Sequence, residues 1–127
     1  MIKALFLTIM AAVYCQTASA NCSYGDIQVA QERLQDYLDD RATAAVVFQN
    51  SKNTVVTECS KYGELISAVG TYYFKDMSKT DYSITGSMNL FPNGKVKEFH
   101  LIGANPNLIN AAKRKGGDAA RLIGSLR

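Results

Sequence analysis

The sequence predicts an α+β domain. We expect an amphipathic helix near the N-terminus, packed on an antiparallel sheet of about four to five strands, with one or more helices after the sheet. Apolar residues recur at helical spacing over residues 24–41 and alternate with polar residues over residues 81–91. A second helical segment starts after residue 105. This order of elements is typical of a helical layer on a single sheet.

Composition places the chain among ordinary globular proteins. Its 127 residues fit one domain, and 47% of them are apolar and 20% charged. A net charge of +3 is too small to indicate a nucleic-acid or membrane partner. There is one His, and there is no zinc motif, phosphate-binding loop or Ser/His/Asp set. The sequence therefore predicts a protein that is not an enzyme and that uses no metal and no cofactor.

The first twenty residues have the pattern of a secretory signal peptide. Lys3 provides the positive charge, residues 4–14 are apolar, and Ala18-Ser19-Ala20 is a small-x-small cleavage site. This apolar stretch is too short to cross a bilayer core, which needs about 20 residues. We therefore expect cleavage of residues 1–20 and export of a single domain at 21–127, without stable membrane insertion. The periplasm is the favoured compartment, and secretion is the alternative.

Two cysteines remain in the expected mature chain, Cys22 and Cys59. An exported chain with two cysteines is most simply one with a disulfide between them. The alternative is a free nucleophilic thiol, which needs a nearby base. The only His, His100, lies far along the chain. The prediction is therefore a disulfide that ties the start of the first helix to a strand.

The helix predicted at 24–41 begins with a capping box, because Asp26 follows Ser23 by three residues. Its buried face is expected to carry Ile27, Ala30, Leu34, Tyr37 and Leu38. The opposite face holds an acidic group, Asp36, Asp39 and Asp40, which we interpret as solvated because a calcium site usually needs a loop that surrounds the ion.

The middle of the chain predicts strands. Val- and Thr-rich residues 43–49 and 54–60 predict two short strands joined by a turn at 50–53. Residues 65–75 predict a longer strand that buries Tyr72 and Phe74 and leaves Tyr73 on the other face. An exposed edge at 43–49 would allow a homodimer.

The second half of the sheet is expected at residues 81–91 and 95–102, joined by the turn Pro92-Asn93-Gly94. Gly86 interrupts the apolar face of the first of these strands, which indicates a bulge or a close approach of another backbone.

The C-terminal region predicts two helices. Asn105 is a good N-cap, and Pro106 suits the first helical position. Lys113-Arg114-Lys115 lies in the last turn, and Gly116-Gly117 stops the helix. Asp118 is expected to cap a short final helix.

Residues 83–115 read SITGSMNLFPNGKVKEFHLIGANPNLINAAKRK. This segment resembles the C-terminal domain of the TonB and TolA energy transducers, in its Pro-Asn-Gly turn and in Gly103-Ala104-Asn105-Pro106-Asn107-Leu108 ahead of an Ala-rich helix. The strands at 43–75 have no evident counterpart in that family, and its final strand is missing here. The resemblance implies a fold and a habit of binding proteins in the periplasm. It does not imply energy transduction, because a cleaved, unanchored domain cannot pull on a motor.

A second resemblance is to the cystatins, which also place a helix before a long antiparallel hairpin. Ile66-Ser67-Ala68-Val69-Gly70 looks like their Gln-x-Val-x-Gly inhibitory loop without its Gln. The resemblance implies a protease inhibitor.

Three groups of residues are candidates for binding a partner. Tyr73 would lie on a contact surface if no helix covers its face of the sheet. Phe91, Asn93 and Lys95 surround the predicted hairpin turn, and residues 76–80 form a second candidate loop. Lys113, Arg114 and Lys115 make the C-terminal region basic, which could attract an acidic partner or an anionic envelope lipid.

Together these observations predict a small exported protein that binds another protein of the cell envelope, similar to a stand-alone TonB or TolA C-terminal domain. The alternative is an immunity protein or inhibitor that blocks a toxin or a cell-wall hydrolase. An enzyme using His100 would need a partner group in a cleft, and the sequence offers only Glu98 on the same strand face.

Overall fold

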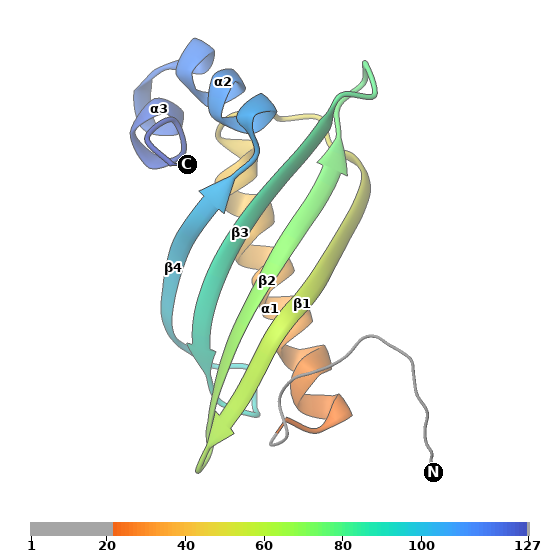
Figure 1. The fold of residues 1–127 in the computed structure, drawn as a ribbon, viewed down its shortest axis with the longest axis vertical. Coiled ribbons are helices and arrows are strands. Elements are labelled where there is room, and N and C mark those ends of the chain that lie inside the picture. The colour runs from red at the N-terminus through yellow and green to blue at the C-terminus, as the bar shows by residue number, and fades with distance from the viewer. Residues whose placement is uncertain (1–21, 127) are drawn as a thin grey trace, which may run out of the picture.

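The computed structural model describes residues 22–126, so the predicted signal peptide at 1–20 lies outside the described residues. The chain forms one long helix, a four-stranded antiparallel sheet and two short helices (Figure 1). The elements are α1 (Tyr24–Thr43), β1 (Asn50–Tyr62), β2 (Leu65–Lys75), β3 (Asp81–Leu90), β4 (Val96–Ala104), α2 (Pro106–Lys115) and α3 (Gly117–Leu122). The α+β class, and the order of a long helix, an antiparallel sheet and C-terminal helices, are as the sequence predicts.

The strands lie in the order β1-β2-β3-β4, each antiparallel to its neighbour. Helix α1 crosses one face of this sheet, and α2 and α3 lie at one end of it (Figure 1). We call this end, with the α1–β1 loop (44–49) and the β2–β3 turn (76–80), the α2 end. The opposite end, with the start of α1 and the β1–β2 and β3–β4 turns, is the turn end.

The start of α1 is fixed by the predicted capping box. Asp26 N donates to Ser23 Oγ at 3.1 Å, and Ser23 N donates to Asp26 Oδ2 at 3.0 Å. Next to this cap, Cys22 and Cys59 form a disulfide, which confirms the predicted pairing. It ties the beginning of α1 to β1 across 37 positions of sequence.

Two glycines let α1 lie close to the centre of the sheet. Gly70 of β2 and Gly86 of β3 are directly opposite each other in the ladder. A Cβ on Gly70 would lie 2.9 Å from Leu34 Cδ1, and one on Gly86 would lie 3.0 Å from Leu38 Cδ2. These two leucines of α1 therefore occupy the space that side chains would fill. The pairing of β3 with β4 also shifts register between Thr85 and Gly86, which confirms the irregularity predicted at Gly86.

The expected strand at 43–49 is wrong. Helix α1 continues to Thr43, and Val46 N still donates to Ala42 O at 2.9 Å, as in a helical turn. Residues 44–49 form the loop between α1 and β1. The turn expected at 50–53 is also wrong, because these residues begin the single strand β1. The strand is irregular at these residues. Ser51 has a φ of 54°, and the pairing of β1 with β2 shifts register between Asn50 and Asn53.

Two smaller differences concern the C-terminal half. Strand β4 runs over Val96–Ala104, two residues beyond the predicted end. Helix α3 has Gly116 at its N-cap with no side-chain cap bond, so Asp118 does not cap it. Asp118 instead pairs with Arg121 at 2.8 Å one turn later.

Candidate functional site

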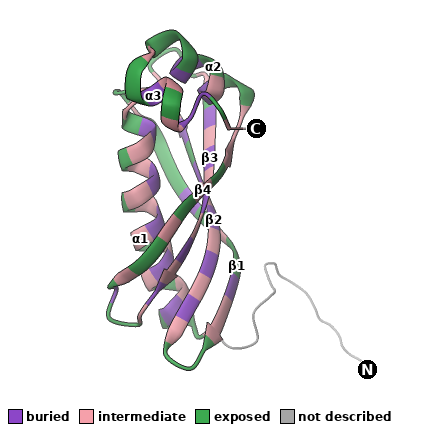
Figure 2. Ribbon diagram, turned by 90° about the vertical axis from the view of Figure 1, so that its left-hand side faces the viewer, coloured by how far each residue is buried: buried purple, intermediate pink, exposed green. Residues whose placement is uncertain are grey.

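The sheet face opposite α1, which we call the outer face, bears no helix within residues 22–126 (Figure 2). Tyr73 lies on this face and is 47% exposed, while its neighbours Tyr72 and Phe74 point into the core. In the ladder Tyr73 stands between Asn53 of β1 and Ser83 of β3. The sequence made Tyr73 a candidate contact residue on the condition that no helix covers its face of the sheet. Within residues 22–126, none does.

Short polar side chains surround Tyr73 on the outer face. Thr71 and Thr85 are cross-strand partners whose hydroxyls hydrogen-bond at 2.8 Å. Asn89 donates to Glu98 Oε1 at 2.8 Å on the same face. Val55, which is exposed, lies diagonally beside Tyr73. Around Tyr73 the face thus combines an aromatic side chain and an aliphatic neighbour with small hydroxyl groups, and a second exposed aromatic, Tyr62, lies on the same face at the turn end.

The β3–β4 turn is held in one conformation by its own hydrogen bonds. Lys95 N donates to Asn93 Oδ1 at 2.9 Å, and Gly94 N donates to Phe91 O at 2.8 Å. Arg33 of α1 donates from Nε to Gly94 O at 2.9 Å, which attaches the turn to the helix. Gly94 has a φ of 92°, a conformation that favours glycine.

The β2–β3 turn is organised around the Asp76 carboxylate. Its Oδ1 accepts from Thr80 N at 3.0 Å and Ser78 N at 2.9 Å, and Oδ2 accepts from Tyr82 Oη at 2.9 Å. The Thr80 N–H, together with these other donors, holds the pKa of Asp76 below its usual range. Burial, followed by the contact with Asp76, raises the pKa of Tyr82.

The structure does not bring the predicted partner residues together. Lys113, Arg114 and Lys115 are exposed in the last turn of α2. Phe91, Asn93 and Lys95 lie at the turn end, the other end of the sheet (Figure 1).

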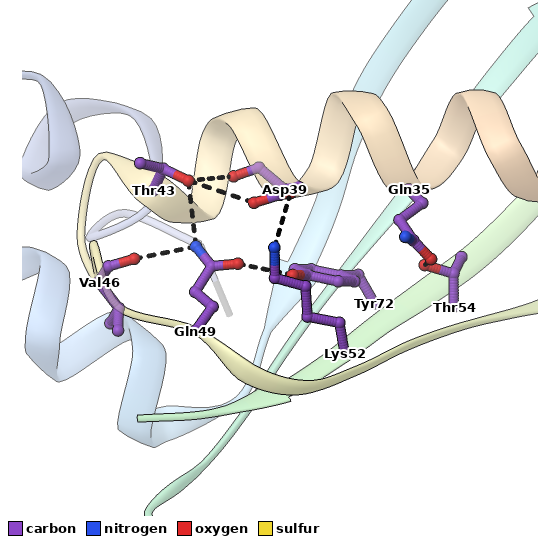
Figure 3. A network of polar contacts seen from close by, with 8 residues as sticks. All are labelled: Gln35, Asp39, Thr43, Val46, Gln49, Lys52, Thr54 and Tyr72. Carbon is purple, nitrogen blue, oxygen red and sulfur yellow. Dashed lines mark hydrogen bonds and ion pairs between the residues drawn. The ribbon is translucent and has the colours of Figure 1, made fainter. Parts of the chain in front are cut away.

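Sequence reasoning missed the α1–β1 loop, where Val47 and Phe48 are exposed. Their Val-Val-Phe context resembles a strand, so periodicity gave no sign of a loop. Gln49 fixes this loop: its Nε2 donates to Val46 O at 2.9 Å and to Thr43 Oγ1 at 3.1 Å, and its Oε1 accepts from Tyr72 Oη at 2.6 Å (Figure 3).

The same network continues along α1 and β1. Thr43 Oγ1 donates to Asp39 O at 2.8 Å, Lys52 pairs with Asp39 at 3.6 Å, and Thr54 donates to Gln35 at 3.0 Å (Figure 3). Burial, with a smaller contribution from the Asp39 charge, raises the pKa of the Tyr72 phenol. The arrangement fixes the loop and the edge strand against the helix.

The remaining candidates from the sequence are the acidic residues of α1 and His100. Asp36 and Asp40 are paired with Arg33 and Arg41, at 3.5 and 2.8 Å. No group of three His, Cys, Asp or Glu side chains placed to hold a metal occurs in the described part of the chain. His100 is exposed on the outer face opposite Ser87, and in residues 22–126 its side chain makes no hydrogen bond or ion pair.

The segment that resembles the cystatin loop, residues 66–70, lies inside β2 and is paired with strands on both sides. These residues are therefore the interior of a strand and not a hairpin turn.

No protein-family model matches this sequence, and neither a curated protein nor a solved structure is significantly similar to it. Among the described helices, none has the length and apolar character needed to cross a membrane.

Proposed function

We propose that residues 21–127 form an exported, non-enzymatic domain of the cell envelope, in the periplasm, that binds another protein through the outer face around Tyr73. The observation that carries the proposal is the absence of a covering helix over this face within residues 22–126 (Figure 2). The signal-like N-terminus and the disulfide are consistent with an oxidising compartment outside the cytoplasm. The resemblance of residues 83–115 to TonB and TolA C-terminal domains supports protein binding there.

The chemistry of the outer face suits a protein partner. Tyrosine is enriched at the centres of protein interfaces because its ring buries a large area at a small entropy loss and its hydroxyl can form a hydrogen bond. Around Tyr73 the side chains of Thr71, Ser83 and Thr85 are short, and the residue is 47% exposed. Strands β1 and β4 are the edges of the sheet and offer a second mode of contact, addition of a partner strand.

The test is affinity capture from the periplasm of the native cells with the mature protein, comparing the wild type, Tyr73→Ser and Tyr24→Ser. Tyr24 is an exposed tyrosine on α1, away from the outer face. We expect a specific partner to be recovered with the wild type and with Tyr24→Ser, and lost with Tyr73→Ser. Recovery that is equal for all three proteins would reject the outer face as the contact.

A second function, inhibition of a toxin or cell-wall hydrolase, is favoured by the rigidity of the β3–β4 turn. A turn already held by Asn93, Gly94 and Arg33 would lose little conformational freedom on entering a cleft. Under this proposal Asn93→Ala and Lys95→Ala weaken inhibition of the hydrolase recovered by capture, and Tyr73→Ser leaves it unchanged. A dose–response that neither turn substitution shifts would reject this turn as the inhibitory loop.

A further inference from the structure

Three apolar side chains project into solvent at the α2 end. Val47 is 56% exposed, Phe48 69% and Met77 76%. They come from two segments, the α1–β1 loop and the β2–β3 turn. These segments lie at the same end of the sheet because Asn50, just after the first segment, pairs with Lys75, just before the second (Figure 1). We call these three residues the apolar tip.

Hydrogen bonds hold the two segments that carry the apolar tip in defined conformations. Gln49 bonds the loop to Tyr72, Thr43 and Val46 (Figure 3), and the Asp76 carboxylate collects two backbone N–H groups of its turn. Each segment therefore presents its apolar residues in a fixed conformation, which reduces the entropy lost when they become buried against something else.

Uncompensated positive charge lies at the same end. Lys79 is exposed in the turn with Met77, and Lys113, Arg114 and Lys115 are exposed in the last turn of α2. None of these four makes an ion pair within residues 22–126.

The nearby carboxylates are already engaged. Asp81 is paired with Lys75 and Asp118 with Arg121, whereas Asp76 accepts only from neutral donors and keeps its negative charge, so that it offsets one of the four cations. The α2 end is therefore both apolar at its tip and positive beside it.

We infer that the α2 end docks reversibly on an anionic lipid bilayer, with Phe48, Val47 and Met77 entering the headgroup region and the α2 cations resting on the lipid phosphates. Apolar residues at the tips of fixed loops, beside lysines and arginines, provide the two contributions that peripheral attachment needs: buried apolar area and attraction to anionic lipid. A bilayer fits better than a protein cleft because the tip is divided between two segments with cations beside it, and a fluid headgroup layer adapts to such a shape.

The first test is sedimentation of the protein, purified from the periplasm of an expression host, with vesicles of phosphatidylcholine alone or with phosphatidylglycerol. We expect binding only to the anionic vesicles. Phe48→Ser/Met77→Ser should weaken it about tenfold or more. The matched control is Tyr24→Ser/Tyr62→Ser, two residues of the turn end that are 76% and 69% exposed, as Met77 and Phe48 are. This control should bind as the wild type does.

The charge contribution has its own matched pair of variants. Lys113→Gln/Lys115→Gln should weaken binding about tenfold or more, whereas Lys95→Gln/Lys97→Gln, which removes two exposed lysines near the turn end, should not. Equal losses for the two charge variants would mean attraction by net charge alone and would overturn the proposed orientation.

Insertion is tested directly by fluorescence, because the chain contains no Trp. Phe48→Trp should shift its emission to shorter wavelength on anionic vesicles and be quenched by brominated acyl chains, and Tyr62→Trp should show neither effect. Absence of wild-type binding to anionic vesicles would overturn the inference, as would an unshifted emission spectrum of Phe48→Trp on vesicles that bind the protein. Loss of a captured acidic protein on tip substitution, without vesicle binding, would also overturn it in favour of a protein cleft. The capture test of Tyr73 is independent of all these outcomes.

Discussion

Tyr72 and Gln49 are joined by a hydrogen bond of 2.6 Å, in which the buried phenol of β2 donates to the side-chain carbonyl oxygen of the α1–β1 loop. The two groups differ in their access to water: Tyr72 is fully buried, and Gln49 is half-buried. Removing the Gln49 side chain should therefore change stability by a different amount from removing the Tyr72 hydroxyl.

Gln49→Ala should destabilise the protein by about 1–3 kcal/mol, because it leaves the buried phenol of Tyr72 without a partner. Tyr72→Phe should destabilise it by about 1 kcal/mol or less, since the carbonyl of Gln49 can turn to water. Urea denaturation of the single and double variants measures both values. Additive effects in the double variant would show that the two side chains do not interact.

The raised pKa of Tyr72 also predicts that the folded protein loses stability at alkaline pH. Burial first, and the Asp39 charge second, raise the pKa of the phenol in the folded state. Its contribution is therefore complete below the unfolded pKa of about 10 and declines as the pH rises above that value. The stability of the wild type relative to Tyr72→Phe should fall between about pH 10 and 11. A constant difference over this range would contradict the burial of the phenol.

Gly86→Ala should destabilise the fold by about 1–3 kcal/mol, through overpacking. Its Cβ would lie 3.0 Å from both Leu38 Cδ2 and Phe99 Cε1 and 3.1 Å from the carbonyl oxygen of His100. Gly25→Ala is the control, because a Cβ at Gly25 would meet only Ser23 Oγ at an ordinary 3.7 Å. Thermal unfolding of the two variants should separate them, and equal melting temperatures would argue against tight packing of α1 on the sheet.

The parts of the fold that follow local rules could be predicted from the sequence. The capping box at Ser23, the alternation in residues 65–75 and 81–91, and the N-cap at Asn105 each depend on residues within a few positions of one another. The strand expected at 43–49 failed because its burial is decided by distant contacts, the bond of Gln49 to Tyr72 among them. The apolar tip was missed for the same reason, since the strand register brings its two segments to one end of the sheet.

The Cys22–Cys59 disulfide should contribute about 3–4 kcal/mol in the chain-entropy description, because it closes a long loop in the unfolded chain. Cys22→Ser/Cys59→Ser should lower the urea midpoint accordingly, and the oxidised protein should lose the same amount on reduction. A variant as stable as the oxidised wild type would show that α1 is held on the sheet by its packing alone.

The lowered pKa of Asp26 predicts how the stability of the protein changes at acidic pH. The Ser23 backbone N–H, 3.0 Å from Oδ2, and the Lys61 ammonium, 3.4 Å from the same atom, lower the pKa of this carboxyl in the folded state. Asp26 therefore stabilises the fold fully above the unfolded pKa of about 4, and this contribution is lost as the pH falls through the lower folded value. Asp26→Asn should destabilise the protein by about 1–2 kcal/mol at pH 7, because it weakens the cap and removes the negative charge beside Lys61.

The difference between the wild type and Asp26→Asn should narrow progressively below about pH 4, because the wild-type carboxyl becomes protonated first in the unfolded state and, at lower pH, in the folded state. Asp36→Asn is the matched control, since Asp36 lies on the exposed face of the same helix in a surface pair with Arg33 at 3.5 Å. Exposed pairs of this kind contribute little, so its effect should stay within about 0.5 kcal/mol at both pH values. Urea denaturation at pH 7 and pH 3 measures all three proteins. A deficit of Asp26→Asn that persists unchanged at pH 3 would show that the side chain acts through its shape and not through its charge.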